Sequence, residues 1–234
     1  MSVALLVPAA SVPTLSLNLG ELAQPSGIST VVKIALVMTA LAILPSVLIL
    51  FTSFVRLIIV FHFLRQALGT QSVPPNQVLA GLALLLTFFV MTPVGQKVYD
   101  DAVAPYQAGQ LGGEQALKLG LAPIKDWMLR NTRENDLLLF AGLAKIPRPA
   151  TRADVPLRVV MPAFLISELK TGFQIGFLLF LPFLVIDLVV SSVLLSMGMM
   201  MLPPVMISFP FKILLFVMVD GWHLLVGSLV QSFR

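Results

Sequence analysis

Four ionisable side chains lie inside or beside long apolar runs of the sequence: Arg56, Asp187, Lys212 and Asp220. A charged side chain in the middle of a membrane costs several times the thermal energy, so such groups face protein or water and usually have partners. Two kinds of chemistry fit them, namely structural ion pairing and the relay of protons or ions. Structural pairing is favoured, because the sequence lacks the acid-rich chain that proton relays use.

Glu168 is a fifth charge of this kind, since it is the only acid between Asp154 and Asp187 and has apolar neighbours. Lys170 is two positions away and therefore lies on a different helical face. We expect Glu168 to pair with a base from elsewhere, across a subunit contact. The candidate bases are Arg130, Arg133, Arg152 and Arg158. The residues assigned to ion pairing between subunits or within the membrane are thus Arg56, Glu168, Asp187, Lys212 and Asp220.

Catalysis has little support in the sequence. Asp220 and His223 are three residues apart, so they share a helical face and could touch, as in a hydrolase. However, the chain has no Gly-x-Ser-x-Gly, no His-Glu-x-x-His and no phosphate-binding loop. It also has no cysteine, which excludes disulfides and cysteine-based metal sites. We therefore expect a protein that is not an enzyme and has no cofactor.

A methionine-rich segment separates two apolar runs late in the chain. Five of the eleven methionines lie between Met197 and Met206. Gly198 permits an unusual backbone turn and Pro203-Pro204 stops a helix, so we assign these three residues to a hinge. Methionine is apolar and deformable, so the segment is either a soft seal or an ordinary apolar turn. The side chains that the hinge would present are Met199, Met200 and Met201.

Composition places the chain in a membrane. Hydrophobic residues make up 58% of the 234 residues, charged residues make up 11%, and the mean hydropathy is +0.97. Soluble domains usually contain about 25% charged residues. The net charge of +4 is spread thinly, without a basic cluster that would indicate nucleic acid. The sequence therefore predicts an integral membrane protein that contacts membrane lipid and binds no nucleic acid.

The order of apolar and polar stretches predicts an all-α fold with four parts. Residues 1–30 form an N-terminal extension or signal remnant, and residues 31–96 form a first pair of apolar helices. Residues 97–160 form a polar, water-facing helical subdomain, and residues 161–234 form a second apolar pair with the methionine-rich hinge. We expect about four apolar helical segments, several of them broken or kinked by proline.

The distribution of lysine and arginine gives an orientation. The connector between the first two apolar runs carries Arg65, and the connector between the last two is followed by Lys212. Basic residues near span ends favour the cytoplasmic side. Both connectors are therefore expected in the cytoplasm, with the long middle segment on the periplasmic side.

Glycines on the apolar helices predict close helix packing. Gly172-x-x-x-Gly176 is a small-residue motif, and Gly81 lies in an earlier apolar run. Small residues let membrane helices approach closely. We interpret these positions as contacts for self-association.

Long motifs in both halves of the chain resemble one known family. They are Thr52–Arg56, Leu64–Gln71, Pro74–Val78, Phe89–Val94, Pro162–Phe177, Asp187–Ser191 and Val219–Trp222, together with the methionine segment. These stretches are similar to the FliP/SctR family of type III secretion export-gate subunits. The resemblance covers the chain from about Leu36 to its C-terminus.

The resemblance implies a function in protein export. Members assemble in several copies with FliQ-like and FliR-like subunits, and work with further export-apparatus membrane proteins of the flagellar basal body in the bacterial inner membrane. The complex would pass unfolded flagellar proteins, with Met199, Met200 and Met201 as a pore gasket. Two alternatives remain: the equivalent subunit of a virulence secretion system, and an ion-coupled transporter subunit using Asp187 and Asp220.

Overall fold

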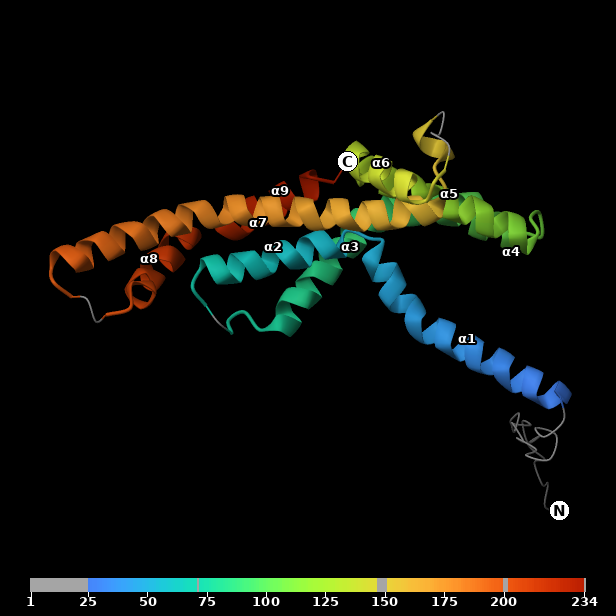
Figure 1. The fold of residues 1–234 in the computed structure, drawn as a ribbon, viewed down its shortest axis with the longest axis horizontal. Helices are drawn as coiled ribbons and strands as arrows, with labels where there is room; N and C mark the ends of the chain where they lie inside the picture. The colour runs from blue at the N-terminus through green and yellow to red at the C-terminus, as the bar shows by residue number, and fades with distance from the viewer. Residues whose placement is uncertain (1–24, 71, 147–150, 200–201, 234) are drawn as a thin grey trace, which may run out of the picture. The chain divides into compact units, whose positions relative to one another are not determined.

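A computed structural model describes residues 25–70, 72–146, 151–199 and 202–233, and these residues form helices joined by turns (Figure 1). The prediction of an all-α fold is confirmed. The helices of the first half are α1 (Pro25–Leu50), α2 (Phe54–Ala67), α3 (Asn76–Val98), the π-helical turn η2 (Tyr99–Val103) and α4 (Ala104–Gln107). Those of the second half are α5 (Gly113–Asn131), α6 (Glu134–Leu143), the short η3 (Arg152–Asp154), α7 (Leu157–Ser196), α8 (Pro204–Met218) and α9 (Gly221–Gln231).

The chain divides into two compact units, residues 1–45 and residues 46–234. In the first unit, the helical stretch Val32–Ile43 is largely apolar, with Lys33 and Thr39 as its polar residues, and its side chains are exposed. An exposed apolar helix needs lipid or protein against it.

The second unit is organised along α7, which has 40 residues and packs against α2, α5, α6 and α8 (Figure 1). At 1.5 Å per residue such a helix is about 60 Å long. The stretches Asn76–Gln107 and Leu157–Ser196 are long and apolar enough to cross a membrane. The pair α8 and α9 would make a third span if counted together, although it bends by 65°.

Not every proline within an apolar run breaks its helix. Pro182 lies inside α7 and Pro210 inside α8, and both helices continue through them. Membrane helices tolerate proline because neighbouring helices and local adjustments satisfy the freed carbonyl. The bend between α8 and α9 occurs instead at Asp220, whose φ of 51° is left-handed. That conformation ends a right-handed helix whichever residue adopts it.

One apolar core surrounds α2. Leu57, Val60, Phe61 and Leu64 are at most 1% exposed, and their spacing places them on one helical face. That face meets α3, α7, α8 and α9 through Leu79, Ala83, Phe183, Phe216, Leu225 and Leu229. The helix α2 is therefore an internal element of the unit.

A second core joins the polar middle of the chain to the start of α7. Trp127 of α5 and Leu137 of α6 pack with Val160 and Phe164 of α7. The rings of Trp127 and Phe164 meet edge to face, with centroids 5.2 Å apart. The first two turns of α7 thus belong to the subdomain that precedes them in the sequence.

The glycine motif of α7 receives α2 of the same chain. A Cβ atom at Gly176 would lie 2.5 Å from the ring of Phe63 and 2.9 Å from its Cβ, and one at Gly172 would lie 3.2 Å from Ile59. Our interpretation of these two glycines as a self-association motif was wrong, because the notch is already filled. The sequence marks a close approach but does not say which helix makes it.

We expect Gly176→Ala to destabilise the protein, because the new methyl group would collide with the fixed part of Phe63. Overpacking of this kind costs about 1–3 kcal/mol. The matched control is Gly81→Ala, where a Cβ meets nothing within 4 Å. The measurement is the thermal unfolding midpoint in mild detergent. Equal midpoints for the two variants would contradict close packing of α2 on α7.

Candidate functional site

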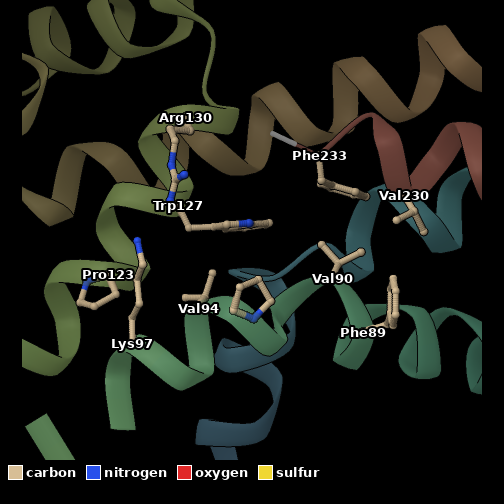
Figure 2. A pocket seen from close by; sticks show the side chains of 10 residues that line it. Phe89, Val90, Val94, Lys97, Pro123, Trp127, Arg130, Val230 and Phe233 are labelled. Atoms are coloured by element: carbon tan, nitrogen blue, oxygen red, sulfur yellow. The ribbon is translucent and has the colours of Figure 1, made fainter. Parts of the chain in front are cut away.

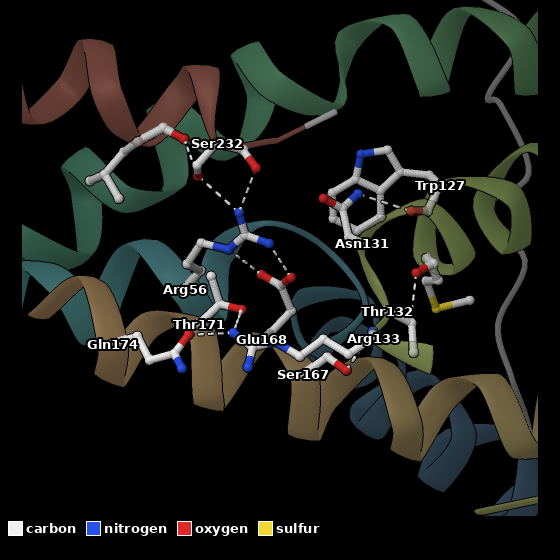
Figure 3. Close-up of polar contacts among 12 residues, drawn as sticks. Arg56, Trp127, Asn131, Thr132, Arg133, Ser167, Glu168, Thr171, Gln174 and Ser232 are labelled. Atoms are coloured by element: carbon white, nitrogen blue, oxygen red, sulfur yellow. Dashed lines mark hydrogen bonds and ion pairs between the residues drawn. The ribbon is translucent and has the colours of Figure 1, made fainter. Parts of the chain in front are cut away.

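The carboxylate of Glu168 on α7 pairs with Arg56 of α2 inside the chain (Figure 3). The Nε of Arg56 donates to Oε2 of Glu168 at 2.8 Å, and Nη2 donates to Oε1. The residues are 3% and 0% exposed. Two parallel N–H bonds to one carboxylate are a strong and geometrically specific arrangement.

The same guanidinium also binds the C-terminal end of the chain. Nη1 of Arg56 donates to the carbonyl oxygen of Ser232 at 2.9 Å and to its Oγ at 2.8 Å (Figure 3). The ring of Phe233 lies 3.9 Å from Cζ of Arg56 and stacks on Trp127. Arg56 therefore joins α2, α7, the residues after α9 and, through Phe233, α5.

The expectation that Glu168 pairs with Arg130, Arg133, Arg152 or Arg158 was wrong. Arg130 pairs with Asp126 in the preceding turn of α5, and Arg152 donates to the carbonyls of Leu129 and Thr132. Arg133 donates to Thr171 and Gln174 on α7. The true partner is 112 residues from Glu168 in sequence, and short-range spacing carries no information on such a pair.

Asp187 of α7 and Lys212 of α8 form a second ion pair. Nζ of Lys212 donates to Oδ2 of Asp187 at 2.7 Å, and Oγ of Ser208 donates to Oδ1 at 2.5 Å. Lys212 is 1% exposed. Both oxygens of Asp187 are engaged within the chain, which leaves this carboxylate poorly placed to bind a transported ion.

Asp220 is not brought to the other charges. It is exposed, at the left-handed turn before α9, and its carboxylate makes no ion pair with the part of the chain that the structure describes. His223 is exposed on the first turn of α9. Ion pairing of Asp220 between subunits stays a prediction.

The hinge residues lie at the tip of the hairpin that α7 and α8 form. Gly198 follows α7 with a φ of 77°, a backbone conformation that favours glycine. Pro203 is the N-cap of α8 and Pro204 is its first residue, where the missing N–H has no cost. Met199 is 42% exposed. Met200 and Met201 lie outside the described residues.

A third polar cluster, which the sequence analysis did not identify, docks α6 on α7. The Oγ of Ser167 donates to Oδ2 of Asp136 at 2.8 Å, Lys170 pairs with Oδ1, and the N–H of Arg133 donates to the Ser167 oxygen at 3.0 Å. Burial would raise the pKa of Asp136, but the hydrogen bonds from Lys170 and Ser167 outweigh it and hold that pKa below its ordinary value. Asp136 lies in a polar stretch of the sequence, where an acidic residue is usually exposed to solvent, so its burial could not be predicted.

We expect Glu168→Ala to be strongly destabilising, because it leaves the buried guanidinium of Arg56 without its counter-charge. Breaking a buried pair in this way costs about 3–5 kcal/mol. The control is Glu114→Ala, which breaks an exposed pair with Lys118 one helical turn away. Unfolding midpoints of the two purified variants give the comparison. A Glu168→Ala midpoint as high as that of Glu114→Ala would show that the buried pair adds no stability.

The lowered pKa of Asp136 predicts a pH dependence. Its carboxylate stabilises the fold above the pKa of the unfolded chain, and this contribution is lost as the pH falls through the lower pKa of the folded protein. The difference in unfolding midpoint between wild type and Asp136→Asn should therefore be large at neutral pH and should shrink in acid. A difference that stays constant down to strongly acidic pH would contradict the pairing with Lys170.

The chain is similar to known proteins over most of its length. The model of the FliP family matches residues 37–229. The Flagellar biosynthetic protein FliP of Bacillus subtilis (strain 168) is 52% identical over 217 residues, which cover 93% of this chain and 98% of that protein. The protein of the same name from Pectobacterium carotovorum subsp. carotovorum is 57% identical over 202 residues, covering 86% and 78%. That of Caulobacter vibrioides is 51% identical over 230 residues, covering 98% and 86%.

The matched region contains α2 to α8 entirely, with Arg56, Glu168, Asp187 and Lys212. The buried pair of Arg56 and Glu168, the partly buried pair of Asp187 and Lys212, and the hairpin that carries the methionine segment thus lie inside the shared sequence. The chain belongs to the FliP family.

Proposed function

We propose that this protein is a subunit of the export gate of the flagellar type III secretion system. Several copies, with FliQ-like and FliR-like subunits, would form the channel that passes unfolded flagellar proteins across the inner membrane of the basal body. The observation that carries the proposal is the family match over residues 37–229, joined to identities of 51–57% with flagellar relatives. These relatives favour the flagellar system over a virulence counterpart.

The hairpin of α7 and α8 is suited to close such a channel. The partly buried pair of Asp187 and Lys212 fixes the two helices to each other, while the chain between these residues contains no charge. An uncharged, apolar constriction resists water and ions by dewetting. We assign the seal to Met199, Met200 and Met201, and the turn that presents them to Gly198, Pro203 and Pro204.

The competing functions have less support. A transporter that uses Asp187 would need free carboxylate oxygens, but Ser208 and Lys212 occupy both. Among the described residues, no group of three His, Cys, Asp or Glu side chains could hold a metal ion.

Energy for export would come from partner proteins. The polar middle segment, which includes α5 and α6, would lie on the periplasmic side.

A secretion assay tests the proposed function. Cells that lack this protein should release no flagellar hook or filament proteins into the medium, and a plasmid copy should restore release. Native mass spectrometry of the purified complex should show several copies of the chain together with FliQ-like and FliR-like subunits. A fully active monomer in mild detergent would contradict the channel.

We expect replacement of Met199, Met200 and Met201 by alanine to leave assembly intact and to make the membrane leaky to small ions, because alanine removes most of the sealing volume. Leucine in the same positions should leak less, since it keeps most of the volume but is less adaptable than methionine. The measurement is ion conductance across vesicles or cell membranes that carry the assembled complex.

The control for the methionine experiment is Met206→Ala, an exposed methionine on the first turn of α8. It keeps the loop itself unchanged and should not raise the conductance. If the triple alanine variant assembles correctly and the ion conductance does not rise, the three methionines do not seal the channel and only fill space as ordinary packing residues.

A further inference from the structure

A cavity of ≈ 420 Å³ lies where α3, α5 and the C-terminal end of the chain meet, inside the unit of residues 46–234. Small-molecule sites commonly have volumes of roughly 300–1,000 Å³. None of the roles assigned above uses this cavity. Its lining side chains are drawn in Figure 2.

One end of the cavity is apolar. Figure 2 shows Phe89 and Val90 of α3 facing Val230 and Phe233 from the end of the chain. The side chain of Phe89 is 67% exposed, and it belongs to a helix that is apolar enough to span a membrane, so it would face lipid. This end of the cavity is therefore open to a hydrocarbon chain.

The other end is basic. Lys97 of α3 and Arg130 of α5 extend toward each other beside the indole of Trp127 (Figure 2). Over the described residues, no carboxylate lies within 4.0 Å of the Lys97 amine. Arg130 pairs with Asp126 at 3.0 Å, but both side chains are about half exposed or more. An ion pair this exposed contributes little free energy, and the guanidinium of Arg130 has further N–H groups that can donate to a ligand.

Along α3, the apolar end of the cavity precedes its basic end, in the same order as the hydrocarbon core and the headgroup layer of a membrane. Lys97 is the first charged residue of this helix, after an uncharged run that starts at Asn76. It therefore marks the level at which the helix leaves the hydrocarbon. A lysine at this level can lay its methylene stem on apolar surface and keep its amine in the headgroup layer. Trp127 beside it is of the residue type enriched at that boundary.

We propose that this cavity binds an anionic phospholipid, with the headgroup phosphate between Lys97 and Arg130 and an acyl chain along Phe89, Val90 and Phe233. Basic pockets between membrane helices bind anionic headgroups in this way. A protein segment would also cover apolar surface, but two converging cations beside an open apolar wall favour a ligand with one anionic and one hydrocarbon end.

The lipid would also support the C-terminal contacts. Phe233 forms one wall of the cavity while its ring packs against Arg56 and Trp127. An acyl chain against Phe233 would hold that ring on Arg56, next to the pair with Glu168. Lipid binding should therefore raise the thermal unfolding midpoint of the whole unit.

The test uses the full-length protein, freed of native lipid, in a non-ionic detergent. Phosphatidylglycerol is titrated, and the shift of the unfolding midpoint gives an apparent affinity. Lys97→Gln combined with Arg130→Gln should weaken this affinity roughly 20- to 30-fold, from the usual contribution of two basic side chains near a lipid surface. Lys97→Arg with Arg130→Lys keeps both charges and should keep the binding.

The matched control is Lys118→Gln with Arg158→Gln, which removes the same net charge at exposed positions outside the cavity. It should bind as wild type does. Phosphatidylcholine with the same acyl chains should shift the midpoint far less than phosphatidylglycerol, because its choline cation cancels the phosphate charge and repels the two basic side chains. Soluble glycerol phosphate should also shift it far less, because it lacks the acyl chains.

Three results would overturn the proposal. The first is equal affinity of the Lys97/Arg130 glutamine variant and its control. The second is a phosphatidylcholine shift as large as that of phosphatidylglycerol, which would mean that the charges are not used. The third is a photo-crosslinker at Phe89 that labels a partner protein in the assembled complex and no lipid, which would identify a protein segment as the occupant.

Discussion

The fold depends on neutralising charge in an apolar setting. Arg56 is buried among the apolar residues of α2, where an unpaired cation would be too costly to keep. Its pairing with Glu168 fixes α2 on α7, and its bonds to Ser232 return the end of the chain to the same place. Three segments far apart in sequence therefore converge on one side chain. The notch at Gly172 and Gly176 lets α2 approach closely enough for this pair to form.

Much of the fold could be predicted from the sequence. The low charge content and the long apolar runs indicate an all-α membrane protein, and Gly198 with Pro203-Pro204 indicates the end of one helix and the start of the next. These features are local, because composition, helix length and turn geometry are set by neighbouring residues. The break at Asp220 was not predicted, since no residue type there requires a left-handed backbone.

The candidate site was predicted less completely, for a physical reason. The residue types Arg56, Glu168, Asp187 and Lys212 are conspicuous because burial of charge is costly, and that cost identifies them as paired. Which residue pairs with which depends on packing between distant helices. The roles of Ser208, Ser232 and Phe233 were missed for the same reason, since a serine or phenylalanine is unremarkable in an apolar sequence.

The intrachain pairing has a consequence for how the protein meets its surroundings. Because the charges of Arg56, Glu168 and Lys212 are satisfied internally, the outward faces of the apolar helices are free of them. Those faces carry large exposed apolar side chains, among them Phe88, Phe177 and Met218. Contacts with other subunits would then depend on shape and apolar area, and lipid can occupy the same surfaces until a subunit arrives. The cavity lined by Lys97 and Arg130 stands apart, because the anionic lipid that we propose there would be selected by its charge from the rest of the bilayer.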